Sequence, residues 1–166
     1  MKIHDILRAG DVKRWHIVRT IKEQSLAEHS FNVCMIARAI AKEACIDDKE
    51  ITKAALAHDL DEVLLGDVPT SVKDKAREQG FDINSLYERV TGRVLATNEV
   101  QILRIADRLE AFWWITFNAM GEHADLVRRD CAHRYEQGIA DPELNPNIML
   151  ASRKVEELIF HAKHTL

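Results

Sequence analysis

The sequence predicts an all-α fold, and three observations support that prediction. Apolar residues recur at helical spacing along most of the 166 residues, and no segment shows the period-two alternation of a half-buried strand. The 6 glycines and 3 prolines are few for an all-β chain, which needs many tight turns. Hydrophobic residues make up 46% of the chain, enough to bury a core and to argue against disorder. The length fits a single domain over residues 1–166.

Composition also restricts the partners and the compartment. The 23 Lys and Arg residues against 27 Asp and Glu residues give a net charge of −4, so we expect no nucleic-acid partner. The most apolar segment, residues 111–117, is far shorter than the roughly 20 residues of a membrane span. The N-terminal residues do not resemble a secretory signal, and Cys34, Cys45 and Cys131 lack metal-type spacing. We therefore expect reduced thiols, a cytoplasmic protein and no membrane partner.

The first half of the chain contains one strong helix signal. Ser25 and Glu28 have the spacing of a capping box, which predicts a helix over residues 26–44. A short helix over 3–9 is expected before it, then a loop over 11–24. A second long helix is expected after it, capped by Asp47 or Asp48 and reaching about residue 60.

The second half is also expected to be helical. Gly66 and Pro69 mark a loop. The helix beginning near Asn98 is apolar nearly all round, which predicts a central position. The expected helices cover residues 70–79, 84–96, 98–120, 121–137 and 147–164.

Certain polar residues lie on apolar helical stripes. His29 lies on the apolar stripe of the capped helix, His58 and Asp59 end the next helix, and Asp107 lies inside the most hydrophobic helix. A buried carboxylate is costly unless it is paired or bound to a metal. Histidine and carboxylate together form a ligand set for a divalent transition metal.

Each of these residues also has an ordinary explanation. A single buried histidine is usually a hydrogen-bonded core residue, and Asp107 has Arg104 and Arg108 nearby as possible partners. One such residue on each of three helices, in the order His, His-Asp, Asp, nevertheless favours a shared site.

This pattern resembles the HD-domain metal-dependent phosphohydrolases, all-α helical bundles with an H…HD…D motif. The flanking sequence resembles the YfbR-type 5′-deoxynucleotidases and the short phage DatZ-like dATP triphosphohydrolases. The resemblance covers roughly residues 11–117. It lies in Arg14-Trp15, Ala27-Glu28-His29-Ser30, the segment from His58-Asp59 to Pro69-Thr70, and Ala106-Asp107.

The resemblance implies a metal centre with nearby catalytic acids. His29, His58, Asp59 and Asp107 would bind a divalent transition metal, with zinc, cobalt or manganese expected. Glu62 would assist proton transfer at the attacking water, and Asp67 would act on the water or the sugar. A solvated glutamate at a helix end and a loop or capping aspartate are the alternatives.

The resemblance also implies a substrate pocket. Arg14 and Lys73 would bind phosphate, and the Trp15 indole would leave no room for a 2′-hydroxyl. Ile17 and Pro69 would form apolar walls around the base. An ordinary core tryptophan and a core isoleucine are the alternatives.

The activity expected from the resemblance is metal-dependent hydrolysis of a 2′-deoxynucleotide. The short span from Asp59 to Asp107 favours a dATP triphosphohydrolase that releases deoxynucleoside and triphosphate, in the host cytoplasm if the chain is phage-encoded. The first alternative is a 5′-deoxynucleotidase acting on monophosphates. A phosphodiesterase of a signalling nucleotide and a non-catalytic metal-containing module are the others. We expect a homo-oligomer, formed through an exposed aromatic cluster at Trp113 and Trp114 or through the last helix.

Overall fold

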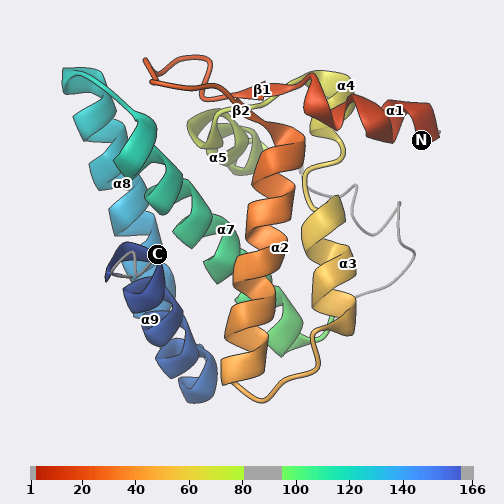
Figure 1. Cartoon of the computed structure of the whole chain (residues 1–166), viewed down its shortest axis with the longest axis vertical. Coiled ribbons are helices and arrows are strands. Elements are labelled where there is room, and N and C mark those ends of the chain that lie inside the picture. Colours follow the sequence, from red (N-terminus) through yellow and green to blue (C-terminus); the bar gives the residue numbers. More distant parts are fainter. Residues whose placement is uncertain (1–2, 81–94, 162–166) are drawn as a thin grey trace, which may run out of the picture.

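The computed structural model describes residues 3–80 and 95–161 (Figure 1). The all-α prediction is confirmed, because helices dominate and the described strands form only one two-stranded sheet. The predicted helix over 84–96 falls mainly on residues 81–94, outside the described residues. The elements are α1 Ile3–Leu7, the 3₁₀ turn η1 Arg8–Gly10, β1 Lys13–Arg14, β2 Gln24–Ser25, α2 Leu26–Glu43, α3 Lys49–Ala57, α4 Glu62–Leu65, α5 Thr70–Glu78, α7 Thr97–Asn118, α8 Glu122–Ile139 and α9 Pro146–His161.

Helices α2 and α7 form the centre of the bundle. Helix α3 packs on α2, while α8 and α9 pack on α7, and α1 crosses one end with the β1–β2 ribbon (Figure 1). The central position expected for the apolar helix α7 is therefore confirmed. The main core joins α2, α3, α7, α8 and α9 through fully buried side chains that include Ile40, Ile51, Leu109, Tyr135 and Ile148.

The predicted N-terminus of α2 is confirmed. Ser25 is the N-cap, and its hydroxyl accepts a hydrogen bond from the backbone N–H of Glu28 at 3.1 Å. The bond satisfies one of the amides that the first helical turn leaves without a partner. His29 follows one turn later, so the cap fixes the backbone that presents it.

Three local predictions are wrong. Helix α3 ends at Ala57, because the backbone tightens into i→i+3 turns, as when Glu62 N–H donates to the Asp59 carbonyl at 2.9 Å. The N-cap of α7 is Ala96, not Asn98, and the Ala96 N–H donates to the Glu99 carboxylate. The expected loop over 11–24 contributes to an antiparallel ribbon, in which Arg14 pairs with Gln24.

A smaller apolar cluster lies beside the ribbon. The Trp15 and Trp114 rings stack with centroids 5.8 Å apart and planes 3° apart. Trp114 is fully buried, so the expectation that it belongs to an exposed aromatic cluster is wrong. Through this stacking contact, the residue that follows β1 packs against α7.

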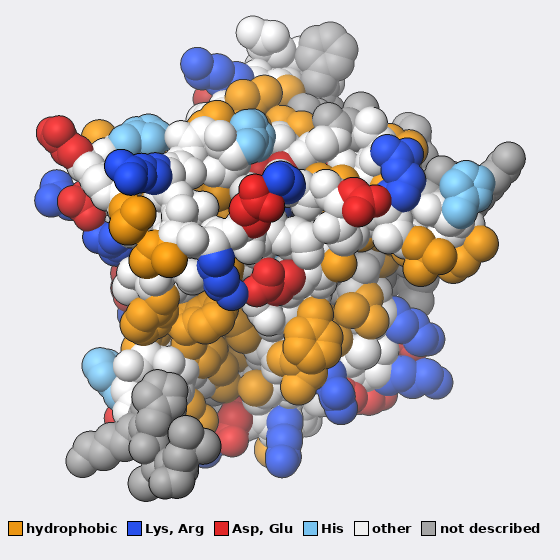
Figure 2. Space-filling model, turned by 45° about the horizontal axis from the view of Figure 1, so that its top comes forward, with side chains coloured by type: hydrophobic (Ala, Val, Ile, Leu, Met, Phe, Trp, Pro, Cys, Tyr) orange, Lys and Arg blue, Asp and Glu red, His pale blue; other side chains and the backbone are white. Residues whose placement is uncertain are grey.

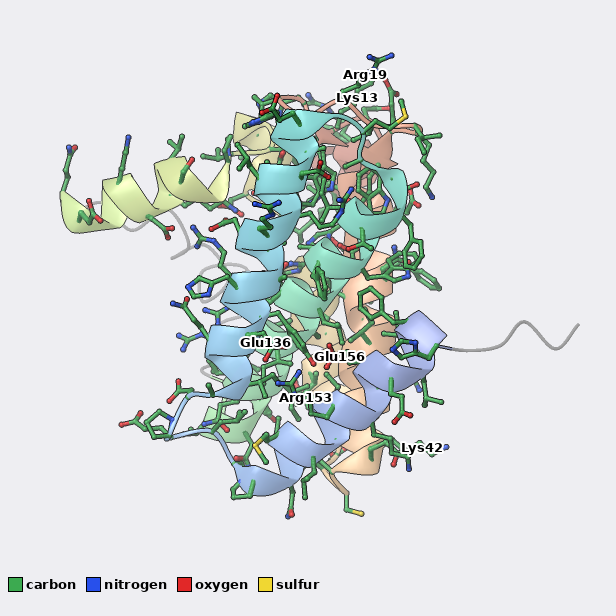
Figure 3. The ribbon with its side chains drawn as sticks, turned by 90° about the vertical axis from the view of Figure 1, so that its left-hand side faces the viewer. Lys13, Arg19, Lys42, Glu136, Arg153 and Glu156 are labelled. Carbon is green, nitrogen blue, oxygen red and sulfur yellow. The ribbon has the colours of Figure 1, made fainter. Side chains whose placement is uncertain are left out.

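The outer helices are joined by charges. Arg153 on α9 points to Glu136 on α8 and to Glu156 on its own helix (Figure 3), with the Arg153 Nη1–Glu156 Oε2 distance at 2.9 Å. Helix α5 projects from the side of the bundle in the same view. None of the helices in the described ranges is long and apolar enough to cross a membrane.

Candidate active site

The four residues expected to bind metal come together from three parts of the fold. His29 lies on α2, His58 and Asp59 follow α3, and Asp107 lies midway along α7. The Nε2 atoms of the two histidines are 3.3 Å apart. His58 Nε2 is 3.2 Å from Asp59 Oδ2, and His29 Nε2 is 3.2 Å from Asp107 Oδ1. Ligand atoms placed tetrahedrally about 2.0–2.2 Å from one ion lie roughly 3.3–3.6 Å apart. His29, His58 and Asp59 each offer a ligand atom within 4.8 Å of the other two, and Asp107 adjoins this group through His29.

The hydrogen bonds of the two histidines also fit metal binding. His29 Nδ1 lies 2.7 Å from the Glu110 carboxylate, and His58 Nδ1 lies 2.8 Å from the Ala55 carbonyl. Both partners only accept hydrogen bonds, so Nδ1 carries the proton in each ring. In both rings Nε2 is therefore the nitrogen that faces the cluster, and loss of its proton leaves the lone pair that a metal ligand requires.

The charged groups of the cluster change one another's pKa values. Burial acts to raise the pKa of Asp59, but the neighbouring His58, His29 and Lys73 together hold it below its usual value. Burial also opposes ionisation of Asp107, yet hydrogen bonds from both histidines hold its pKa well below the usual range. Both carboxylates are therefore anionic at neutral pH, which suits a cation.

Glu62 lies beside the cluster at the start of α4. Its side chain is 1% exposed, and its Oε1 atom is 2.5 Å from Lys73 Nζ. Its Oε2 atom is buried and has no hydrogen-bond partner within the described ranges. Burial and the negative charge of Asp59 raise the pKa of Glu62 to about 7. Arg14 Nη1 lies 3.7 Å from this oxygen, within ion-pair range but beyond hydrogen-bond distance. A buried acceptor oxygen with no hydrogen bond is suited to bind a water or a substrate hydroxyl.

Asp67 and Arg14 fix the N-terminal ribbon against this centre. Asp67 Oδ2 accepts a hydrogen bond from the Trp15 backbone N–H at 3.3 Å. Arg14 Nη1 is 3.3 Å from Asp59 Oδ2 and 3.7 Å from Asp67 Oδ1. Trp15 has a φ of 61°, a left-handed conformation that a bulky residue rarely adopts. The aspartate holds this conformation in place, and such strain is often found at functional sites.

A cavity of about 980 Å³ opens beside the cluster between α5, α7, α8 and the ribbon. This volume lies within the roughly 300–1,000 Å³ typical of small-molecule sites. All five predicted substrate residues line it, as do three of the four expected metal ligands and Asp67. These lining residues are Arg14, Trp15, Ile17, Pro69, Lys73, His58, Asp59, Asp107 and Asp67.

Comparison with known proteins identifies the family. The model of the family described as "5′-deoxynucleotidase YfbR-like" matches residues 4–97, more than half of the chain. The chain belongs to the YfbR-like family. The expected membership of the HD-domain phosphohydrolases is thus confirmed.

Two phage enzymes are among the relatives of this YfbR-like chain. It is 26% identical to the dATP triphosphohydrolase of Cyanophage S-2L, over 98% of this chain and 94% of the relative. It is 31% identical to the dATP triphosphohydrolase of Salmonella phage PMBT28, over 82% of this chain and 77% of the relative.

A solved structure agrees with this relationship. The Cyanophage S-2L HD phosphohydrolase DatZ, bound to dA and one catalytic Zn²⁺ ion, superposes on this YfbR-like chain with a TM-score of 0.80. The two chains are 25% identical, and the match covers 96% of each.

Sequence analysis missed two residues that the structure places behind the site. Glu110 and Gln24 are both fully buried, and each contacts a residue that was predicted. A signal for Glu110 was present, since it is a carboxylate on the apolar helix only three residues after Asp107. Gln24 gave no comparable signal, because an isolated glutamine before a capping box is typical of a loop.

Proposed function

We propose that this chain is a metal-dependent triphosphohydrolase of dATP, which releases 2′-deoxyadenosine and triphosphate. The observation that carries the proposal is the cluster of His29, His58 and Asp59, with Asp107 beside His29, at the wall of a nucleotide-sized cavity. The buried Glu62 lies next to this cluster. The two phage relatives are both named dATP triphosphohydrolase, which supports the triphosphate reaction.

The four cluster residues are proposed to hold one divalent ion, with zinc as the first candidate and cobalt or manganese as alternatives. The related DatZ structure contains a catalytic Zn²⁺. Such an ion supplies Lewis-acid stabilisation of the charge that develops on the phosphoryl group.

Glu62 is the proposed general base and acid. Its Oε2 atom, which accepts no hydrogen bond from the described residues, takes a proton from the attacking water, and the proton is then available to the departing 5′-oxygen of the deoxynucleoside. Lys73 binds the other carboxylate oxygen and so fixes the orientation of the carboxylate group. The overall reaction consumes one water and gives 2′-deoxyadenosine and triphosphate.

The cavity walls are proposed to select and orient the substrate. Arg14 and Lys73 are both cationic beside the cluster and suit a phosphate group. The Trp15 indole is the proposed barrier to a 2′-hydroxyl, and Ile17 and Pro69 are the proposed walls around the base. Asp67 acts mainly by holding the backbone of Trp15 in position.

One observation favours a second candidate, a 5′-deoxynucleotidase acting on monophosphates. The family model that matches residues 4–97 bears that description. The residues proposed for metal binding and proton transfer would serve both reactions, since they act at the phosphoryl group next to the sugar.

A nucleotide panel tests the proposal. Purified protein supplied with Zn²⁺, Co²⁺ or Mn²⁺ is incubated with dATP, ATP and dAMP, and the products are separated by ion exchange. We expect dATP to give deoxyadenosine and triphosphate in equal amounts, and ATP to react far more slowly. Release of orthophosphate from dAMP, with dATP left intact, would instead establish the 5′-deoxynucleotidase.

The role of Trp15 is tested in the same panel. Trp15→Ala opens the space assigned to the 2′-hydroxyl, so the variant is expected to narrow the gap between dATP and ATP. Equal turnover of the two nucleotides by the unaltered protein contradicts sugar selection by Trp15 and leaves the assignment of the metal ligands standing.

A further inference from the structure

Behind the metal cluster lies a buried carboxylate that the proposed reaction does not use. Glu110 is fully buried on α7 and accepts three hydrogen bonds. Its Oε2 atom is 2.7 Å from His29 Nδ1, and its Oε1 atom accepts from Gln24 Nε2 at 2.6 Å and from Asn32 Nδ2 at 3.0 Å. The three donors offset the cost of burying the charge of this carboxylate, which would be too high without them.

Gln24 extends this network towards the substrate cavity. It is fully buried, and its Oε1 atom accepts a hydrogen bond from the Trp15 indole Nε1–H at 2.8 Å. Its amide nitrogen donates to Glu110. The orientation of the amide is fixed, because turning it over would set its NH₂ group against the indole N–H and its carbonyl against the carboxylate.

One continuous set of hydrogen bonds therefore runs from Trp15 through Gln24 and Glu110 to His29. Along this set, the group to which each side chain is bonded determines whether that side chain donates or accepts. At one end Glu110 fixes the protonated nitrogen of His29, and at the other Gln24 fixes the edge of the indole ring. Trp114, one turn after Glu110 on α7, stacks on the face of the same indole ring.

We propose that Gln24 and Glu110 are positioning residues that join the metal centre and the sugar-selecting wall into one hydrogen-bonded unit. The inference about sugar selection rests on the proposed function. Through this unit, Glu110 sets the tautomer and basicity of His29. Gln24 sets the tilt of the Trp15 ring, whose backbone is already held in a left-handed conformation.

Two substitutions distinguish the two ends of the unit. Glu110→Gln removes the charge facing His29, and we expect Co²⁺ affinity, measured by chelator competition, to fall roughly 10–100-fold. When the new amide oxygen accepts from the His29 Nδ1–H, its NH₂ group faces the NH₂ group of Gln24. The Gln24 amide then has to turn over, and it loses its hydrogen bond to Trp15. Gln24→Met removes the link to Trp15 but leaves His29 and Asn32 bonded to Glu110, so Co²⁺ affinity should stay near that of the unaltered protein.

Sugar selection is measured by binding, without turnover. The readout is the ratio of affinities for 2′-deoxyadenosine and adenosine, determined by calorimetry. Both substitutions release the indole edge, so both are expected to reduce this ratio by roughly tenfold, a typical size for one steric or polar contact.

An exchange of the two side chains tests the direction of the hydrogen bonds. Gln24→Glu combined with Glu110→Gln restores a donor–acceptor pair at each contact once the Asn32 amide turns over. In the double variant, the ratio of affinities for 2′-deoxyadenosine and adenosine should return towards that of the unaltered protein. This variant should not regain metal affinity, because the residue facing His29 remains uncharged. If Gln24 and Glu110 had a merely structural role, the double variant would not recover the sugar ratio while leaving metal affinity low.

Tyr135→Phe is the matched control. Tyr135 is fully buried in the same bundle, and its hydroxyl lies 3.1 Å from Glu156, in the outer helices. This control should lower the melting temperature without changing metal affinity or the sugar ratio. The proposal is overturned if the Gln24 and Glu110 variants behave like this control.

The experiment also separates this proposal from the proposed function. If dATP is not hydrolysed, the binding measurements on Glu110→Gln and Gln24→Met keep their meaning. If the unaltered protein binds deoxyadenosine and adenosine equally, the coupling to sugar selection is refuted together with the role of Trp15. Unchanged Co²⁺ affinity in Glu110→Gln refutes the part assigned to His29.

Discussion

At the scale of single residues, the environment of Glu62 differs from that of the neighbouring carboxylates. Asp59 and Asp107 are held anionic by the histidines, whereas burial and the charge of Asp59 raise the pKa of Glu62 to about 7. Carboxylates with such divergent pKa values suit different tasks, the anionic ones as ligands and the raised one as a proton carrier.

Replacement of Glu62 tests that division. Glu62→Gln keeps the size of the side chain and leaves the four proposed ligands untouched, so metal content should be retained. The amide cannot take a proton from water, and turnover of dATP should fall by roughly 10²–10⁴-fold. Metal analysis and single-turnover rates check both expectations. Asp107→Ala is the comparison variant, expected to lose metal and activity together, and full activity of Glu62→Gln would assign proton transfer to another group.

The three cysteines provide a second test of residue environments. Cys45 is exposed, Cys34 is buried, and Cys131 lines the cavity wall. Burial, with the nearby Asp130 charge, raises the pKa of Cys131 to about 12. The thiolate is the reactive form, so at neutral pH Cys131 should be almost unreactive and should react faster only as the pH rises towards 12. Iodoacetamide labelling followed by peptide mass spectrometry should modify Cys45 first. Rapid labelling of Cys131 at pH 7 in the folded protein would contradict the burial of its thiol in the cavity wall.

At the scale of elements, α7 brings several parts of the site together. Asp107, Glu110 and Trp114 lie at steps of three and four residues, so they share one face of the helix. That face carries a proposed metal ligand, the carboxylate that orients His29, and the surface on which Trp15 stacks. A rigid helix is a precise support for such a constellation.

The elements also show how far the sequence predicts this fold. Helix α2 was predicted because its signals are local, with Ser25 and Glu28 only three residues apart. The proposed ligands were predicted because polar residues on apolar stripes are conspicuous. The ribbon was missed because it pairs only Lys13 with Ser25 and Arg14 with Gln24, too few residues for a visible alternation. The burial of Trp114 was missed because its partner, Trp15, is distant in sequence.

The cap of α2 is expected to contribute measurably to stability. Ser25→Ala removes the acceptor for the Glu28 N–H, and the free energy of unfolding should fall by about 1 kcal/mol. Urea denaturation monitored by circular dichroism measures the change. Ser25→Thr keeps a capping hydroxyl and should recover most of the loss. Equal destabilisation by both substitutions would mean that the cap is not the source of the effect.

At the scale of the whole molecule, an aromatic cluster joins α7 and α9. Phe112 and Phe117 both approach the Phe160 ring, with centroids 4.9 Å and 5.9 Å away, and Trp113 contacts Phe117. Phe117 is 54% exposed. Hydrophobic side chains gather over part of the face shown in Figure 2. Exposed apolar patches of this kind often mark protein interfaces.

We therefore expect a homo-oligomer with this aromatic cluster at an interface. Light scattering coupled to size-exclusion chromatography should give a mass at least twice the 19.0 kDa of one chain. Phe117→Glu places a charge in the cluster and should shift the equilibrium towards the monomer. Leu126→Glu, on an exposed side chain of α8, is the control and should leave the mass unchanged. A monomeric mass for the unaltered protein would contradict the expectation.

Metal binding should also stabilise the whole fold, because the proposed ligands come from α2, the turn after α3, and α7. In the unfolded chain these three segments are not held together, so a metal that binds only the folded state adds its binding free energy to stability. At a free metal concentration about 100 times Kd, this amounts to about 2.7 kcal/mol, or about 5–11 °C in melting temperature for a domain of this size. A chelator should lower the melting temperature by that amount, and added Zn²⁺ or Co²⁺ should restore it. Asp107→Asn should abolish most of the response, whereas Ser25→Ala should melt earlier and still respond fully. An identical melting temperature with chelator and with excess metal would show that these side chains do not form a metal centre.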